Sequence, residues 1–234
     1  MKTVSIGDTH GMAVVDAVLK MINKYDKFIF AGDYVDAFDV DNTTMKKNLL
    51  DIIELKKKYP EKIILLWGNH DIHYLLGNKY YCSGYRPEMK HDFNEIFNSN
   101  ENLFQLAFQS EDWLWTHAGI STGWFESRFK PFAGGHNNTL SISELLNLAF
   151  DNRYPALFDV GYERGGDRKF GGPLWCDITE LGYDPLKGFN QIVGHNPQEH
   201  IISIKRHDKE VAFIDILQRK DKVDPSCFYY KEID

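Results

Sequence analysis

Three short apolar runs near the N-terminus, separated by two segments of helical periodicity, constrain the fold of this chain most strongly. The runs are KTVSI (2–6), KFIFAG (27–32) and KIILLWG (62–68). Apolar residues recur every three or four positions in 12–25 and in 41–60, and Pro60 ends the second of these segments. This strand–helix–strand–helix–strand order predicts a parallel sheet covered by helices on both faces.

The second half of the chain has a different pattern. The polar, aromatic stretch near 78–102 is interpreted as an insertion with one helix near 88–98, and 120–170 is expected to hold short helices and loops. Four apolar runs follow at short intervals without helices between them, which indicates hairpins in a second, more antiparallel sheet. The runs are QIVGHN (191–196), HIISIK (200–205), VAFIDI (211–216) and SCFYYKE (226–232). We therefore predict an α/β fold of two mixed sheets packed as a sandwich flanked by helices, in a single domain over 1–234.

Composition limits the partners and the compartment. The formal net charge of −7 argues against a dedicated nucleic-acid binder or a binder of anionic membranes, because both need clustered Lys and Arg. No apolar stretch approaches the roughly 20 residues that a membrane span needs. The three cysteines are widely spaced, which favours a reducing compartment, and polar residues follow the first six positions too soon for a secretory signal. We expect a cytoplasmic protein.

Five apolar runs end in residue types that bind metals. With a glycine within two positions each time, the runs deliver Asp8 and His10, Asp33 and Asp36, Asn69 to Asp71, His117, and His195 with Asn196. Functional sites of parallel α/β sheets form at the carboxyl ends of strands. Carboxylate and amide oxygens with imidazoles suit Mn, Fe or Zn. Two such ions about 3.5–4 Å apart can clamp a phosphoryl group, and Asp33 is the candidate for the carboxylate that bridges them.

In this order, the motifs GDTHG (7–11), GDYVD (32–36), GNHD (68–71), HAG (117–119) and GHN (194–196) resemble the calcineurin-like metallophosphoesterases. The resemblance is greatest to the phosphoprotein phosphatase branch, which includes bacterial-type serine/threonine phosphatases and diadenosine tetraphosphatase-like enzymes. GGPLWCD (171–177) is similar to a further segment of that branch. The motifs span residues 7 to 196, which is most of the chain.

The resemblance implies a metal centre and an acid catalyst. Two divalent ions are expected, with Mn first and Fe or Zn as alternatives, and a hydroxide bound between them is the expected nucleophile. The implied ligands are Asp8 and His10 for the first ion, Asp33 as the bridge, and Asn69, His117 and His195 for the second ion. His70 is implied as the general acid, oriented by Asp36, and a carboxylate beside a histidine favours its protonated form.

The chain departs from the pattern of that branch at two places. Ala37 and Phe38 replace an expected Arg-Gly pair whose arginine grips the phosphate, and Asp71 replaces Glu. Arg164 and Arg168, on a glycine-rich loop, are the candidates for a substitute grip, with Arg164 preferred.

Several residues also have purely structural interpretations. Asp8 could cap a helix, and for Asp71 we favour a capping role. Histidines outside the motifs, His73 among them, are interpreted as surface or loop residues.

Three functions remain open. The first is a serine/threonine protein phosphatase or general phosphomonoesterase. The second, motivated by the missing arginine and by the aromatic insertion, is a dinucleoside polyphosphate hydrolase or a cyclic phosphodiesterase. The third is a non-catalytic metal-binding scaffold. The expected partner is a phosphorylated protein, or a small phosphoester or nucleotide.

Overall fold

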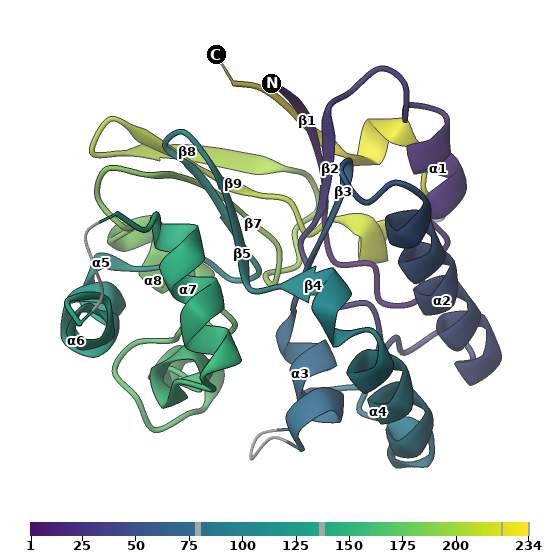
Figure 1. Ribbon diagram of the computed structural model, residues 1–234, viewed down its shortest axis with the longest axis horizontal. Coiled ribbons are helices and arrows are strands. Elements are labelled where there is room, and N and C mark those ends of the chain that lie inside the picture. The colour runs from purple at the N-terminus through teal and green to yellow at the C-terminus, as the bar shows by residue number, and fades with distance from the viewer. Residues whose placement is uncertain (78–80, 136–138, 221, 234) are drawn as a thin grey trace.

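Two five-stranded sheets form the framework of the protein (Figure 1). The computed structural model describes residues 1–77, 81–135, 139–220 and 222–233. The first sheet has the order β10 (Tyr229–Glu232), β1 (Lys2–Ile6), β2 (Lys27–Phe30), β3 (Ile63–Leu66) and β4 (Phe104–Gln105). The second has the order β5 (Ala107–Ser110), β6 (Trp113–Thr116), β7 (Asn190–Val193), β9 (Lys209–Phe213) and β8 (Ile202–Arg206). The predicted pair of mixed sheets is therefore confirmed.

Strand directions correct two expectations about the C-terminal region. Strands β1 to β4 run parallel, and β10 pairs antiparallel with β1, so SCFYYKE belongs to the first sheet and not to the second. In the second sheet β6, β7 and β9 run parallel, and only β8 and β9 form the expected hairpin. Periodicity along the chain identifies a strand but leaves its partner undetermined, which is why both expectations were wrong.

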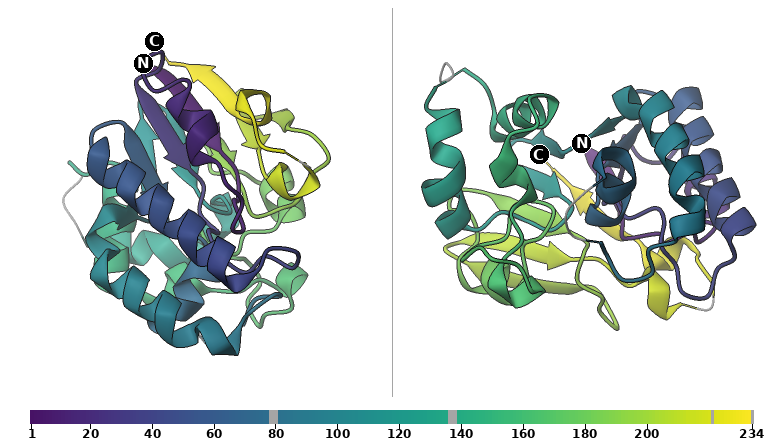
Figure 2. Two further views of the ribbon diagram at one scale, coloured as in Figure 1. Left: turned by 90° about the vertical axis from the view of Figure 1, so that its right-hand side faces the viewer. Right: turned by 90° about the horizontal axis from the view of Figure 1, so that it is seen from below.

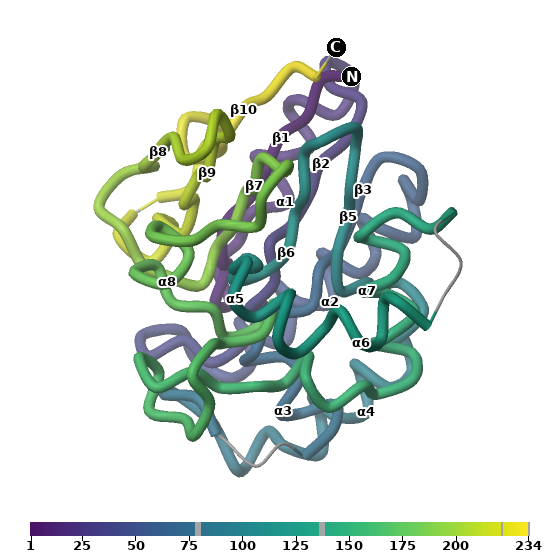
Figure 3. The backbone as a smooth tube through the Cα atoms, turned by 90° about the vertical axis from the view of Figure 1, so that its left-hand side faces the viewer, coloured from purple at the N-terminus to yellow at the C-terminus, as the bar shows by residue number. Residues whose placement is uncertain are grey.

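The alternation of side chains along β2 shows how the layers are packed. Phe28 and Phe30 point to the helices, whereas Ile29 and Ala31 point into the space between the sheets, where they meet Trp115 of β6. In the described parts of the chain, the first sheet therefore carries helices on one face, because the second sheet covers the other, so the prediction of helices on both faces is wrong. Figure 3 shows the strands of the second sheet in front of those of the first, and the opposed inner faces form one apolar layer.

Helices cover the outer faces of the sandwich and its carboxyl-terminal edge (Figures 1 and 2). The α-helices are α1 (Val15–Leu19), α2 (Asn42–Lys58), α3 (Asn69–Leu76), α4 (Lys90–Ser99), α5 (Thr122–Trp124), α6 (Lys130–Ala133), α7 (Ile142–Asp151) and α8 (Ile178–Tyr183). The 3₁₀ helices are η1 (Pro87–Met89), η2 (Glu101–Leu103), η4 (Pro155–Phe158), η5 (Tyr162–Arg164), η6 (Leu217–Arg219) and η7 (Pro225–Cys227), and η3 (Phe125–Phe129) is a π-helix. No helix in the described parts of the chain is long and apolar enough to cross a membrane.

Helix α2 illustrates how local sequence fixes an element. Asp41 caps its first turn by accepting a hydrogen bond from the Thr44 backbone N–H at 3.0 Å, and three lysines in its last turn complement the helix dipole. Its buried stripe includes Met45 and Leu49, which pack in the core between the helices and the first sheet. The helix ends just before Pro60, as predicted.

The predicted insertion begins with residues 78–80, which lie outside the described residues, as do 136–138 in the loop-rich segment. The helix expected near 88–98 is confirmed as α4. It packs against α3, where the rings of Tyr74 and Phe93 are 5.0 Å apart and the Asn94 amide donates to the Tyr74 carbonyl at 2.7 Å. The insertion therefore supports α3, which carries part of the site described next.

Candidate active site

The carboxyl ends of parallel strands from both sheets meet at one point. Residues 8 and 10 follow β1, 33 follows β2, 69 begins α3 directly after β3, and 117 and 195 follow β6 and β7. All six expected ligand residues are buried there: Asp8, His10, Asp33, Asn69, His117 and His195. A hydrogen bond of 2.8 Å from the His195 backbone N–H to Asp8 Oδ2 ties the two sheets together at this point.

Asp33 lies at the centre of this group. Its Oδ2 atom is 3.4 Å from His117 Nε2, 3.8 Å from His10 Nε2 and 3.9 Å from His70 Nε2. Two triads of close ligand atoms share Asp33, one with His10 and His70 and the other with His117 and His195. A carboxylate common to two clusters has the position that a bridge between two cations requires.

Backbone carbonyls fix the tautomers of two histidines. His10 Nδ1 is 2.8 Å from the Val35 carbonyl and His117 Nδ1 is 2.8 Å from the Ala31 carbonyl. Because a carbonyl only accepts, both Nδ1 atoms carry the proton, and each Nε2 presents a lone pair to the centre. His117 Nε2 is also 2.7 Å from Asn69 Oδ1, which is another acceptor. The lone pairs of His117 Nε2 and Asn69 Oδ1 repel each other at this distance, so a cation bound by both atoms would fit the arrangement.

The amide of Asn69 has a defined orientation. Its Nδ2 group donates to the Cys82 sulfur at 3.0 Å, so Oδ1 must face His117 and His195. Cys82 is thus a free, buried thiol that holds a candidate ligand in place.

Buried carboxylates give the site an excess of negative charge. Burial raises the pKa of Asp215 to about 7, and the charge on Asp33 adds to that effect. Burial and the charges of Asp215 and Asp33 also raise the pKa of Asp8. Asp8 Oδ1 and both oxygens of Asp215 are buried without a hydrogen-bond donor among the described residues. Acids left this way are stabilised by a bound cation, so the site fits the divalent metals of a phosphoesterase.

Asp215 was not among the residues that the sequence predicted for the site. It follows β9, the third parallel strand of the second sheet, so it occupies the same kind of position as the predicted ligands. The run VAFID carries a signal that could have identified it, namely an apolar strand that ends in a carboxylate. The glycine and histidine that marked the other motifs are absent there.

The expected acid pair is assembled beside Asp33. His70 Nδ1 is 3.0 Å from Asp36 Oδ2, and the Tyr74 hydroxyl donates to Asp36 Oδ1 at 2.5 Å. Burial lowers the pKa of His70, but the charges of Asp33 and Asp36 outweigh burial and raise the pKa above its usual range. His70, which lines a pocket together with Asp33, Asn69 and His195, therefore keeps its proton to higher pH than an ordinary histidine does.

The expectation that His73 lies at the surface is wrong. Its side chain is buried, and Nε2 is 2.8 Å from Asp36 Oδ2. Residues three apart share a face of a helix, so α3 directs His70 and His73 to the same carboxylate. The Cys82 backbone N–H donates to His73 Nδ1 at 3.3 Å, so His73 also links the inserted segment to the acid pair.

Asp71 is the cap that the sequence suggested, and it does more. Its carboxylate accepts hydrogen bonds of 2.9 Å from the backbone N–H groups of Gly68, Asp33 and Tyr34. The first bond caps α3, and the other two hold the loop that carries Asp33. This loop needs support, since Asp33 has φ of 52° and Asp36 has φ of 68°, in the left-handed region where residues other than glycine are strained, although aspartate and asparagine less than most.

We expect Asp71→Ala to destabilise the metal-free protein by at least about 3 kcal/mol, because three buried N–H groups lose their acceptor at about 1–3 kcal/mol each. Urea unfolding of the chelator-treated protein measures the change. Asp71→Asn should cost less, since its amide oxygen still accepts. Asp51→Ala removes an exposed helix pair with Lys47 and should stay within about 0.5 kcal/mol. A similar loss in Asp71→Ala and Asp51→Ala would contradict the role of Asp71.

The two candidate arginines are placed differently. Arg164 lines the pocket, with Nε 2.8 Å from Asp177 Oδ2 and Nη2 donating to Asn196 Oδ1. Arg168 is outside the residues that line this pocket, and its Nε lies 3.4 Å from Asp159 Oδ1. The structure thus brings Arg164, and not Arg168, to the ligand residues.

A sandwich that gathers histidines and carboxylates around a shared aspartate at its strand ends has the arrangement of a metal-dependent enzyme. Residues 1–223 match the sequence model of the calcineurin-like phosphoesterases, so the chain belongs to that family of metal-using phosphoester hydrolases. No curated protein matches the chain.

Solved structures that resemble this one include two phosphoesterases. One is a protein serine/threonine phosphatase from Saccharomyces cerevisiae with similarity to human phosphatase PP5 (18% identity, TM-score 0.41, 90% of this chain and 54% of that chain). The other is a metallophosphoesterase from Sphaerobacter thermophilus (14% identity, TM-score 0.42, 100% of this chain and 90% of that chain). The match thus spans about half the length of the yeast chain.

Proposed function

We propose that this protein is a cytoplasmic phosphomonoesterase with two divalent metal ions, preferentially Mn²⁺, and that it acts on phosphoserine or phosphothreonine in proteins. The observation that carries the proposal is the His70–Asp36 pair held next to Asp33, the aspartate shared by both ligand triads. Such a pair supplies what a phosphomonoester needs and a metal cluster alone lacks, namely a proton for the leaving alkoxide.

The candidate ligands divide between two positions. Asp8, His10 and Asp33 would hold one ion, and Asp33, Asn69, His117 and His195 the other. When bound, the ions supply an activated water and neutralise the phosphoryl charge.

The remaining steps belong to the side chains. Arg164, fixed by Asp177 and Asn196, would bind a phosphoryl oxygen with its guanidinium group. His70 would donate its Nε2 proton to the leaving oxygen, while Asp36 keeps the ring oriented through Nδ1. Asp36 is itself held by Tyr74 and lies beside His73, so the acid enters the reaction already oriented.

The single arginine among the described lining residues of the pocket favours one phosphoryl group as the reacting group. The cavity is about 410 Å³, and Arg164 is the only Arg or Lys among its described lining residues. One guanidinium group suits a single phosphoryl group better than a polyphosphate chain, which favours a monoester. The second candidate, hydrolysis of a dinucleoside polyphosphate or cyclic nucleotide, is supported by the exposed aromatic rings of Phe38 and Tyr81 at this pocket.

A substrate panel separates these candidates. With Mn²⁺, Fe²⁺ or Zn²⁺ added to chelator-treated enzyme, we expect hydrolysis of p-nitrophenyl phosphate and of phosphoserine and phosphothreonine peptides, fastest with Mn²⁺. Diadenosine tetraphosphate and 2′,3′-cyclic nucleotides should turn over at least about tenfold more slowly, because one guanidinium group cannot neutralise a longer anionic chain. Faster turnover of a nucleotide would replace the first candidate with the second. The absence of any metal-dependent hydrolysis would reject both.

A further inference from the structure

A groove beside the active-site pocket is the feature that the metal centre and the acid pair leave unexplained. It measures about 310 Å³ and shares His10, Phe38 and Gln218 with the pocket, so the two cavities adjoin. Accepting the phosphomonoesterase function, we propose that this groove is a leaving-group subsite that takes a planar aromatic group of the substrate beyond the leaving oxygen, such as an aromatic side chain next to a phosphoserine, stacked on Phe38.

The groove has an apolar side formed by Met12, Ala37, Phe38 and Val40. Its charged lining residues are Asp39 and Lys220, whose charges are opposite. The groove therefore offers little attraction to a second anionic group. Its chemistry favours an uncharged ring over another phosphate.

Position 37 helps to fix one wall of the groove. Ala37 is where the resemblance led us to expect arginine, and it lines the groove although it is buried among core residues. Arg86 Nη2 donates to the carbonyls of Ala37 and Val40, so the backbone on both sides of Phe38 is held firmly.

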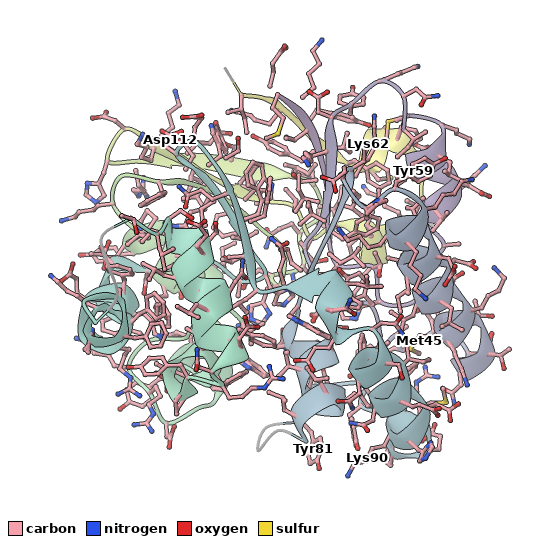
Figure 4. The ribbon with its side chains drawn as sticks, in the orientation of Figure 1. Met45, Tyr59, Lys62, Tyr81, Lys90 and Asp112 are labelled. Atoms are coloured by element: carbon pink, nitrogen blue, oxygen red, sulfur yellow. The ribbon has the colours of Figure 1, made fainter. Side chains whose placement is uncertain are left out.

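Phe38 provides the stacking surface. Its side chain is 76% exposed although it stands between two cavities, so one face of the ring is available to a ligand. Burying an aromatic ring is favourable, and an aromatic partner adds about 0.5–1.5 kcal/mol beyond burial, which corresponds to about 2- to 10-fold in affinity. Tyr81 is a second exposed ring of the main pocket, close to the C-terminal end of α3 (Figure 4).

Two primary alkyl phosphates, 2-naphthylmethyl phosphate and ethyl phosphate, test the subsite. Their leaving alcohols have similar acidity, so the ratio of their kcat/KM values reports on binding of the ring. We expect the Mn²⁺-loaded enzyme to prefer the naphthylmethyl ester and Phe38→Ala to lower that preference about 2- to 10-fold, mainly through KM. Phe38→Tyr retains the ring and should retain the preference.

Tyr183→Ala is the matched control, since Tyr183 is 86% exposed and is outside the described lining of both cavities. The ratio of the kcat/KM values for the two esters should be the same in Tyr183→Ala as in the wild type. An enzyme that hydrolyses both esters without preferring the aromatic one, or a preference unchanged in Phe38→Ala, would overturn the subsite and leave the phosphomonoesterase function standing. Hydrolysis of neither ester would overturn the proposed function and the subsite with it.

Discussion

Asp33→Asn is expected to lose both metal ions and at least about a thousandfold of kcat/KM, since metal-assisted stabilisation of phosphoryl charge contributes several kcal/mol. The backbone N–H of His70 donates to Asp33 Oδ1 at 2.9 Å, so the amide oxygen of the variant would take that position. Its NH₂ group would then face the Nε2 atoms of His117 and His10. It would donate to the lone pairs that should bind the ions, and it cannot itself bind a cation.

Metal analysis of the purified protein after Mn²⁺ reconstitution, together with steady-state kinetics, measures both effects. Asp208→Asn makes the same chemical change on the exposed turn between β8 and β9, at a residue whose φ of 61° asparagine also accepts. It should keep two ions and full activity. An Asp33→Asn protein that still binds two ions would contradict the bridging role.

His70→Asn should lower kcat for a phosphoserine peptide by about 10²- to 10⁴-fold while two ions stay bound, because only the proton donor is removed. The loss should be smaller for p-nitrophenyl phosphate, whose leaving group needs little help from an acid. The wild-type rate should fall as pH rises through the pKa of His70, which Asp33 and Asp36 raise against the effect of burial. The variant should lack that alkaline decline.

His91→Asn is the control for this experiment, since His91 lies on α4 with a side chain that is 88% exposed. It should match the wild type in rate, metal content and pH profile. Equal losses for the two leaving groups in His70→Asn would exclude the general-acid role and would leave a structural role for His70. An undiminished rate in His70→Asn would exclude both the general-acid role and a structural role for His70.

The fold class and the positions of the candidate ligands follow from local pattern. Asp8, Asp33 and His117 were singled out because each follows an apolar run with a glycine within two positions, and parallel strands bring such ends together. Only neighbouring residues are needed to see this pattern, so the sequence predicted the fold class and the residues that the structure brings together.

The residues that were missed or misplaced depend on partners distant in sequence. Strand β10 looks like any other strand, and only its pairing of Glu232 with Lys2 assigns it to the first sheet. His73 looks like a surface histidine until Asp36, from another loop, is placed against it. Asp71 was recognised as a cap, but its bonds to Asp33 and Tyr34 depend on how α3 approaches the loop.

The link between His195 and Asp8 has a consequence for the order of events during synthesis. These two residues are separated by 187 positions, and the candidate ligands between them come from both sheets. On a ribosome, a nascent chain would carry Asp8, His10 and Asp33 long before His195 emerges. A complete ligand set would then exist only after the second sheet has docked on the first. Uptake of the second ion, whose candidate ligands include His117 and His195, would therefore report that the two sheets have docked.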